Sequence, residues 1–117
     1  MQYLALIYSD PTVDAKRTDE ENAAYIGAYQ VFTEHSKAVG AYRAGEALMP
    51  AQTAKSVRVR DGERLVTDGP FAETREVLGG FYMLECETEE EAIELASRIP
   101  TAAHGTIEVR PIMTWDD

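Results

Sequence analysis

Two hydrophobic periodicities alternate along the chain and predict its strands and helices. In Tyr3–Tyr8, odd-numbered and even-numbered positions alike carry apolar side chains, most of them large. Such a strand is predicted to be covered on both faces. Val77–Glu85 is mostly apolar and aromatic, interrupted only by Gly79-Gly80, and predicts a central strand. Two shorter runs, Ala41–Leu48 and Thr106–Met113, predict the remaining strands of one sheet.

Two capping boxes predict where the helices begin. Thr18-x-x-Glu21 and Thr88-x-x-Glu91 each place a Thr three residues before a Glu, as at helix N-termini. Residues at three- and four-residue steps then predict the buried face of each helix. For the first helix these are Tyr25, Ala28, Phe32, His35 and Val39, and for the second they are Ala92, Leu95, Ala96 and Ile99.

A hairpin is predicted between the second and third strands of the sheet. Ser56–Arg60 alternates Val with Arg, Asp61-Gly62 is typical of a tight turn, and Glu63–Thr67 is predicted to pair back. Pro11–Arg17 is predicted to be a polar loop. Without the hairpin the order is βαββαβ, so the predicted class is α+β with the ferredoxin-like plan.

Two helices cover only one face of a four-stranded sheet. Half of the apolar strand residues would then face water, and an exposed apolar patch of that size marks an association surface. Two-fold pairing is the commonest solution, so the pattern predicts a homodimer held by the face opposite the helices.

Composition limits the domain count and the partners. The 117 residues predict a single domain, 1–117, with an ordinary hydrophobic share of 44%. A net charge of −10 argues against nucleic acid and anionic membranes. The single cysteine, Cys86, ends an apolar strand and is predicted to be a buried, inert thiol. That cysteine and the absence of a leader-like or membrane-spanning segment predict a cytoplasmic location.

The loop before the central strand is the predicted site. Asp68-Gly69-Pro70 is a strong loop signal, and charged residues follow it into the strand at Val77. The alternative is a long connection whose charges are merely solvated. The four charges concerned are Asp68, Glu73, Arg75 and Glu76.

This loop also carries a resemblance. Asp68 through Glu76 is similar to the signature of the DGPF (DGPFAETKE) family of YCII-related proteins, with Arg75 in place of Lys. The resemblance extends over nearly the whole chain. It implies a ferredoxin-like domain that pairs as a dimeric α/β barrel, and it implies a link to extracytoplasmic-function sigma factors. It implies no particular reaction.

The candidate chemistry is acid–base. The sequence has no metal-ligand spacing, no Gly-rich phosphate loop and no nucleophile elbow, so no cofactor is predicted. His35 and Asp68 are the catalytic candidates, as an imidazole beside a carboxylate that could move a proton on a small polar molecule. Two structural alternatives stay open: His35 as a core residue with satisfied nitrogens, and Asp68 as a cap of its own turn.

Three classes of function remain. The first is a small-molecule isomerase or lyase that needs no cofactor. The second is a ligand-binding module, and the third is a regulatory partner of a sigma factor. The residues predicted to bind the ligand, by charge or by aromatic surface, are Tyr8, Phe71, Glu73, Arg75, Tyr82 and Arg110.

Overall fold

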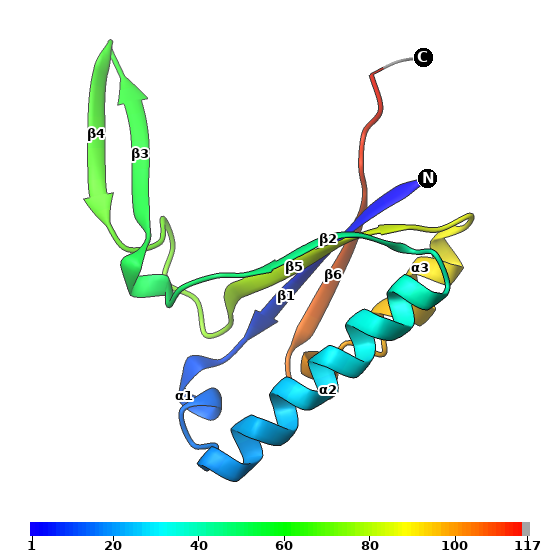
Figure 1. The fold of residues 1–117 in the computed structure, drawn as a ribbon. Coiled ribbons are helices and arrows are strands. Elements are labelled where there is room, and N and C mark those ends of the chain that lie inside the picture. The colour runs from blue at the N-terminus through cyan, green and yellow to red at the C-terminus, as the bar shows by residue number, and fades with distance from the viewer. Residues whose placement is uncertain (116–117) are drawn as a thin grey trace.

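One antiparallel sheet and two helices form the body of the molecule. The computed structural model describes residues 1–115. Strands lie in the order β2–β5–β1–β6, and Figure 1 shows α2 and α3 on one side of the sheet. The mixed α+β class and the antiparallel sheet are therefore confirmed. The bounds are β1 Gln2–Ser9, α2 Asp19–Ala38, β2 Tyr42–Ala47, β5 Val77–Glu85, α3 Glu89–Ala96 and β6 Thr106–Pro111.

The core lies between the sheet and the helices. Along β1, Tyr3, Ala5 and Ile7 are buried and the residues between them are less so, as the pleat of a strand requires. The predicted stripe of the second helix is confirmed. Its members Ala92, Leu95, Ala96 and Ile99 are all buried, although Ile99 follows the last helical residue.

Both predicted helix starts are confirmed. The Thr18 hydroxyl accepts from the backbone N–H of Glu21, and the Glu21 carboxylate accepts from the N–H of Thr18, so this box is reciprocal. At α3, Thr88 accepts from the N–H of Glu91, whereas the Glu91 carboxylate turns to the N–H of Glu87. The second capping box therefore has only one of the two hydrogen bonds that the first one has.

The buried face of α2 was predicted incorrectly in part. Phe32 is buried as expected, but Ala28 and Val39 are exposed. Ser36 is fully buried, and Tyr29 and Thr33 turn inward with it. Hydroxyl groups can occupy this face because each has a hydrogen-bond partner there, which an apolar periodicity does not reveal.

The predicted loop at 11–17 contains a short helix instead. Pro11–Asp14 forms α1, with Asp10 as its N-cap. The Asp10 carboxylate accepts from the Thr12 backbone N–H and hydroxyl, and these bonds hold the pKa of Asp10 below its ordinary value. Pro11 suits the first helical position because its missing N–H would have no partner there.

The second face of the sheet carries no helix or strand in the described part of the chain. Leu4, Leu6 and Tyr8 alternate with the buried residues of β1 and so point to this face, beside Phe81 and Met83 of β5. We call it the open face. None of the helices in residues 1–115 is long and apolar enough to cross a membrane.

The predicted hairpin forms an arm that stands away from the body, as Figure 1 shows. Strands β3 (Lys55–Arg60) and β4 (Glu63–Asp68) pair only with each other in a two-stranded sheet. Their turn has positive φ at Asp61 (52°) and Gly62 (78°), which is the geometry of a tight hairpin turn. A short 3-10 helix, Ala51–Thr53, leads from β2 into the arm.

Candidate functional site

A cavity of about 620 Å³ lies between α2 and the sheet. Its walls come from β1, β2, β5, the middle of α2, the segment from α1 to α2 and Thr101 before β6, and its rim is open. They are largely aromatic and apolar with a polar group at one end, the combination that small-molecule sites use. The lining residues used below are Ser9, Asp14, Arg17, Tyr25, Tyr29, Thr33, Gly45, Gly80, Tyr82 and Thr101.

Glycines provide the space for this cavity on the sheet side. A methyl group on Gly80 would meet the carbonyl oxygen of Glu46 at 2.7 Å, and one on Gly45 would meet the Tyr82 ring at 2.6 Å. Gly45 therefore marks a close approach of β2 to Tyr82, while the register shift in β2 falls between Tyr42 and Ala44. Larger residues at these two positions would push the strands apart or displace Tyr82.

Asp14 and Arg17 form the charged end of the cavity. The Asp14 carboxylate accepts from the Ser9 hydroxyl at 2.7 Å and from Nη2 of Arg17 at 2.7 Å. The Arg17 side chain is only 17% exposed, and its guanidinium carbon lies 3.9 Å from the centre of the Tyr25 ring. An aromatic face attracts a cation at this distance, so Arg17 is fixed from two sides.

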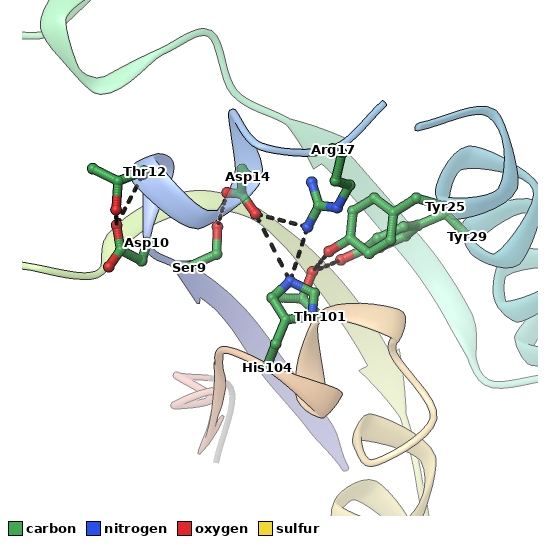
Figure 2. Close-up of polar contacts among 9 residues, drawn as sticks. All are labelled: Ser9, Asp10, Thr12, Asp14, Arg17, Tyr25, Tyr29, Thr101 and His104. Atoms are coloured by element: carbon green, nitrogen blue, oxygen red, sulfur yellow. Dashed lines mark hydrogen bonds and ion pairs between the residues drawn. The ribbon is translucent and has the colours of Figure 1, made fainter. Parts of the chain in front are cut away.

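His104 joins this charged end from another part of the chain, as Figure 2 shows. Its Nε2 accepts from Nη2 of Arg17 at 2.9 Å and lies 3.8 Å from Oδ1 of Asp14. An N–H of Arg17 can donate to Nε2 only when that nitrogen carries no proton, so this contact corresponds to the neutral imidazole protonated on Nδ1. We call Asp14, Arg17 and His104 the charged triad.

Three hydroxyl groups extend the polar wall. The Tyr25 and Tyr29 hydroxyls both contact the hydroxyl of Thr101, at 2.6 Å for Tyr29 (Figure 2). Burial raises the pKa of the Tyr29 phenol well above its ordinary value of 10.0, and burial also raises the pKa of Tyr82. Both groups are therefore neutral near pH 7 and can donate or accept a hydrogen bond.

Chain topology brings the triad together. Asp14 ends α1, which follows β1 directly, and Arg17 precedes the N-cap of α2. His104 lies two residues before β6, and β6 pairs antiparallel with β1 so that Thr106 is opposite Tyr8. The residues after β1 and before β6 therefore share one end of the sheet.

The two predicted catalytic residues lie in different parts of the molecule. His35 lines a smaller hollow between α2 and α3, where Nη1 of Arg98 donates to its Nε2 at 3.1 Å. Asp68 ends β4 at the base of the arm and forms an ion pair with Lys55. The single chain does not bring His35 and Asp68 together, because the arm carries Asp68 away from the helices.

The predicted ligand-binding residues are also dispersed. Tyr82 lines the cavity, and its hydroxyl contacts that of Thr33 at 2.8 Å. Tyr8 and Arg110 belong to the open face, where Arg110 forms an ion pair with Glu108. Exposed positions in the loop after the arm are occupied by Phe71, Glu73 and Arg75, of which Arg75 contacts Asp10 at 3.3 Å.

Cys86 lines the hollow that also contains His35. Its thiol is buried as predicted, and burial raises its pKa, which keeps it protonated. Within residues 1–115, no group of three or more His, Cys, Asp or Glu side chains is arranged to hold a metal ion.

The triad was missed by the sequence analysis. Asp14 and Arg17 lie in the segment Pro11–Arg17, which was predicted to be a polar loop, and His104 lies just before the predicted strand Thr106–Met113. A signal was nevertheless present. The predicted βαββαβ order already pairs the first and last strands, so polar residues after one and before the other are expected to be neighbours.

Together, the fold and the cavity define a small α+β domain with an aromatic pocket that has a charged triad at one end. The chain belongs to the family described as the YCII-related domain, whose model matches residues 1–116. It is similar to an uncharacterized protein of Rhizobium meliloti (strain 1021). The two are 33% identical over 117 residues, which cover 98% of this chain and 94% of the relative.

A solved structure shares the fold. It is the 5-chloro-2-hydroxyhydroquinone dehydrochlorinase of Burkholderia phenoliruptrix AC1100 in complex with 2,5-dihydroxybenzoquinone. The TM-score is 0.56 with 15% sequence identity, and the match covers 97% of this chain and 94% of the other. At this identity the likeness establishes the fold alone.

Proposed function

We propose that this YCII-related protein binds a small, planar, oxygen-rich molecule in the 620 Å³ cavity and catalyses a proton transfer on it without a cofactor. The observation that carries the proposal is the Arg17 guanidinium, held between Asp14 and His104 at the end of an aromatic pocket. A cation, a carboxylate and an imidazole are the groups that enolisation of a carbonyl compound needs.

Arg17 binds the carbonyl oxygen in this mechanism. A guanidinium has five N–H donors, and Arg17 uses Nη2 on both triad partners, so its other donors are available to a ligand oxygen. As negative charge develops on that oxygen, a cation fixed over the Tyr25 ring stabilises it. The rings of Tyr25, Tyr29 and Tyr82 offer flat surfaces to a flat ligand.

Asp14 acts as the base. The C–H bond next to the carbonyl breaks, its proton passes to the Asp14 carboxylate, and its electron pair moves onto the oxygen held by Arg17. His104 lies 3.8 Å from Asp14 and its side chain is partly exposed, so it can exchange the proton with water. The Ser9 hydroxyl orients the carboxylate throughout.

The structural neighbour supports the class of ligand. That enzyme, by its name, acts on a chlorinated hydroxyhydroquinone and was solved with a dihydroxybenzoquinone. In this chain, the aromatic walls of the cavity and the Arg17 cation at its end suit hydroxyquinones and small cyclic ketones. The sigma-factor alternative receives no support from these comparisons.

Hydrogen–deuterium exchange detects the proton transfer whatever final product the reaction forms. The protein is incubated in D₂O with a panel of small cyclic ketones and diketones that carry an sp³ C–H next to the carbonyl, and loss of that C–H signal is followed by proton NMR. Binding of 2,5-dihydroxybenzoquinone, whose ring C–H is vinylic, is measured separately by titration. We expect exchange above the buffer rate for at least one compound. Asp14→Asn should abolish exchange but keep binding, and Arg17→Gln should weaken binding about tenfold or more.

Arg98→Gln and His35→Asn are the matched controls because they alter the other Arg–His contact. Both should leave exchange and binding unchanged. Binding without any exchange would reduce the protein to a ligand-binding module. Exchange that survives Asp14→Asn would refute the assignment of the base.

Three finer assignments accompany this proposal. The Asp68–Glu76 motif supports membership of the DGPF branch, and the single buried cysteine supports a cytoplasmic location. The ferredoxin-like plan and the apolar open face support pairing of two chains as a dimeric α/β barrel.

A further inference from the structure

The arm formed by residues 55–68 is exposed on both sides. Every residue of β4 is exposed, and β3 is exposed except at Ser56. The register pairs Val57 with Val66, so these two side chains share one face with Val59, and all three are more than half exposed. An isolated two-stranded ribbon is marginally stable in water, so a ribbon with an apolar face requires a cover.

The whole chain exposes more surface than its mass warrants. A compact monomer of 13.0 kDa has an accessible area of about 6,300 Å², whereas this chain has 8444 Å². Its radius of gyration is 16.3 Å, compared with about 13 Å for a compact domain of this length. The excess area matches what one subunit of an obligate dimer buries.

The arm extends to the side of the sheet that lacks helices. In Figure 1 it rises on the side opposite α2 and α3, which is the side of the open face. The open face and the arm therefore border the same space. A second copy placed on the open face would lie within reach of the arm.

Charge favours a second copy as the occupant. The arm contains the basic residues Lys55, Arg58, Arg60 and Arg64 and the acidic residues Asp61, Glu63 and Asp68, a net charge of +1. Since the whole chain carries −10, the remaining residues carry −11. A weakly basic arm is attracted to the acidic body of a second copy. In a two-fold dimer, each of the two arms contacts the acidic body of the other subunit.

We propose that the arm is a clasp that packs on a second copy of this chain. The two open faces meet about a two-fold axis, and each arm crosses to the other subunit with Val57, Val59 and Val66 against it. The arm thereby adds an interface that the sheet faces alone do not provide. This inference concerns assembly and does not depend on the chemistry of the cavity.

Sedimentation equilibrium at micromolar concentration tests the clasp. The wild-type chain should be a dimer. Replacing residues 57–66 by Asn-Gly, which closes the Ser56–Thr67 pair with a tight turn, should raise the dimer dissociation constant about a hundredfold. Val66→Asp should raise it about tenfold or more, whereas Thr67→Asp, on the other face of the same strand, should change it less than about threefold. Far-ultraviolet circular dichroism checks that each variant keeps its helices.

A photo-crosslink identifies what the arm touches. A benzophenone side chain at position 59 should produce a covalent dimer, and mixing isotope-labelled with unlabelled protein should show that the joined peptides come from different copies. A monomeric wild type, an unchanged dissociation constant after arm removal, or crosslinks confined to one copy would each overturn the proposal.

Discussion

Two Arg–His contacts lie near opposite ends of α2, and in each an arginine N–H donates to a histidine Nε2. Arg17 donates to Nε2 of His104 at 2.9 Å, and Arg98 donates to Nε2 of His35 at 3.1 Å. Each arginine also contacts a carboxylate, Asp14 in the first case and Glu94 in the second. The Arg–His distances therefore do not distinguish them, although Arg17 lies 2.7 Å from its carboxylate and Arg98 lies 3.4 Å from its own.

The surroundings of the two Arg–His contacts distinguish them. The Arg17 side chain is 17% exposed beside a cavity of about 620 Å³, whereas that of Arg98 is 53% exposed beside a hollow of about 250 Å³. Arg17 lies over an aromatic ring and its carboxylate partner is also held by Ser9. Water competes far less for charges in the first setting, so the same pair becomes a preorganised site in one place and a solvated contact in the other.

The largest difference between the two Arg–His contacts is expected in the stability that is lost when each arginine is replaced. Arg17→Met should lower the free energy of unfolding by about 1–3 kcal/mol, because it leaves the partly buried Asp14 without its charged partner. Arg98→Met should cost less than about 0.5 kcal/mol, as for exposed ion pairs. Urea denaturation of both variants measures the difference, and equal losses would show that burial does not distinguish the pairs.

The helix caps beside the two pairs should differ by a smaller amount. Thr18 directly follows Arg17, and Thr88 opens the helix that carries Glu94. Both Thr→Ala variants should lose about 0.5–2 kcal/mol. Thr18→Ala should lose more, because it also disrupts a reciprocal box that α3 lacks. Chemical denaturation that ranks the two variants in the opposite order would contradict this.

The smallest expected effect concerns the buried phenol beside the triad. The pKa of Tyr29 is raised in the folded state because burial disfavours the phenolate. The stabilisation from this group is therefore complete below pH 10.0, the ordinary phenol value, and declines as the pH rises above it. Thermal melts from neutral pH to beyond pH 10 should show a shallower loss for Tyr29→Phe than for the wild type. Parallel profiles would mean that Tyr29 is not protected from ionisation.

Local rules predicted most of the fold. Thr18 and Thr88 were recognised as caps because their partners lie three residues away, and the turn at Asp61-Gly62 depends on two adjacent residues. The apolar stripe of α3 follows directly from its period. Interactions that close within a few residues leave a readable pattern in the sequence.

The charged triad was not predicted because its residues are joined only by the fold. Asp14 and His104 are separated by most of the chain, and the pairing of Tyr8 with Thr106 brings them together. His35 was selected for its helical face, and that face does lead to an arginine, but to an exposed one. Burial of a polar side chain depends on which elements cover it, and hydrophobic periodicity carries no such information.

The connection of the arm has an evolutionary consequence. Strands β2 and β5 are neighbours in the sheet, and the arm is inserted between them where a short turn would suffice. Lengthening, shortening or losing the arm therefore leaves the order of the sheet and the residues of the triad unchanged. With the arm as the proposed clasp, descendants of this chain could change how they assemble while they conserve the pocket, or change the pocket while they conserve their assembly.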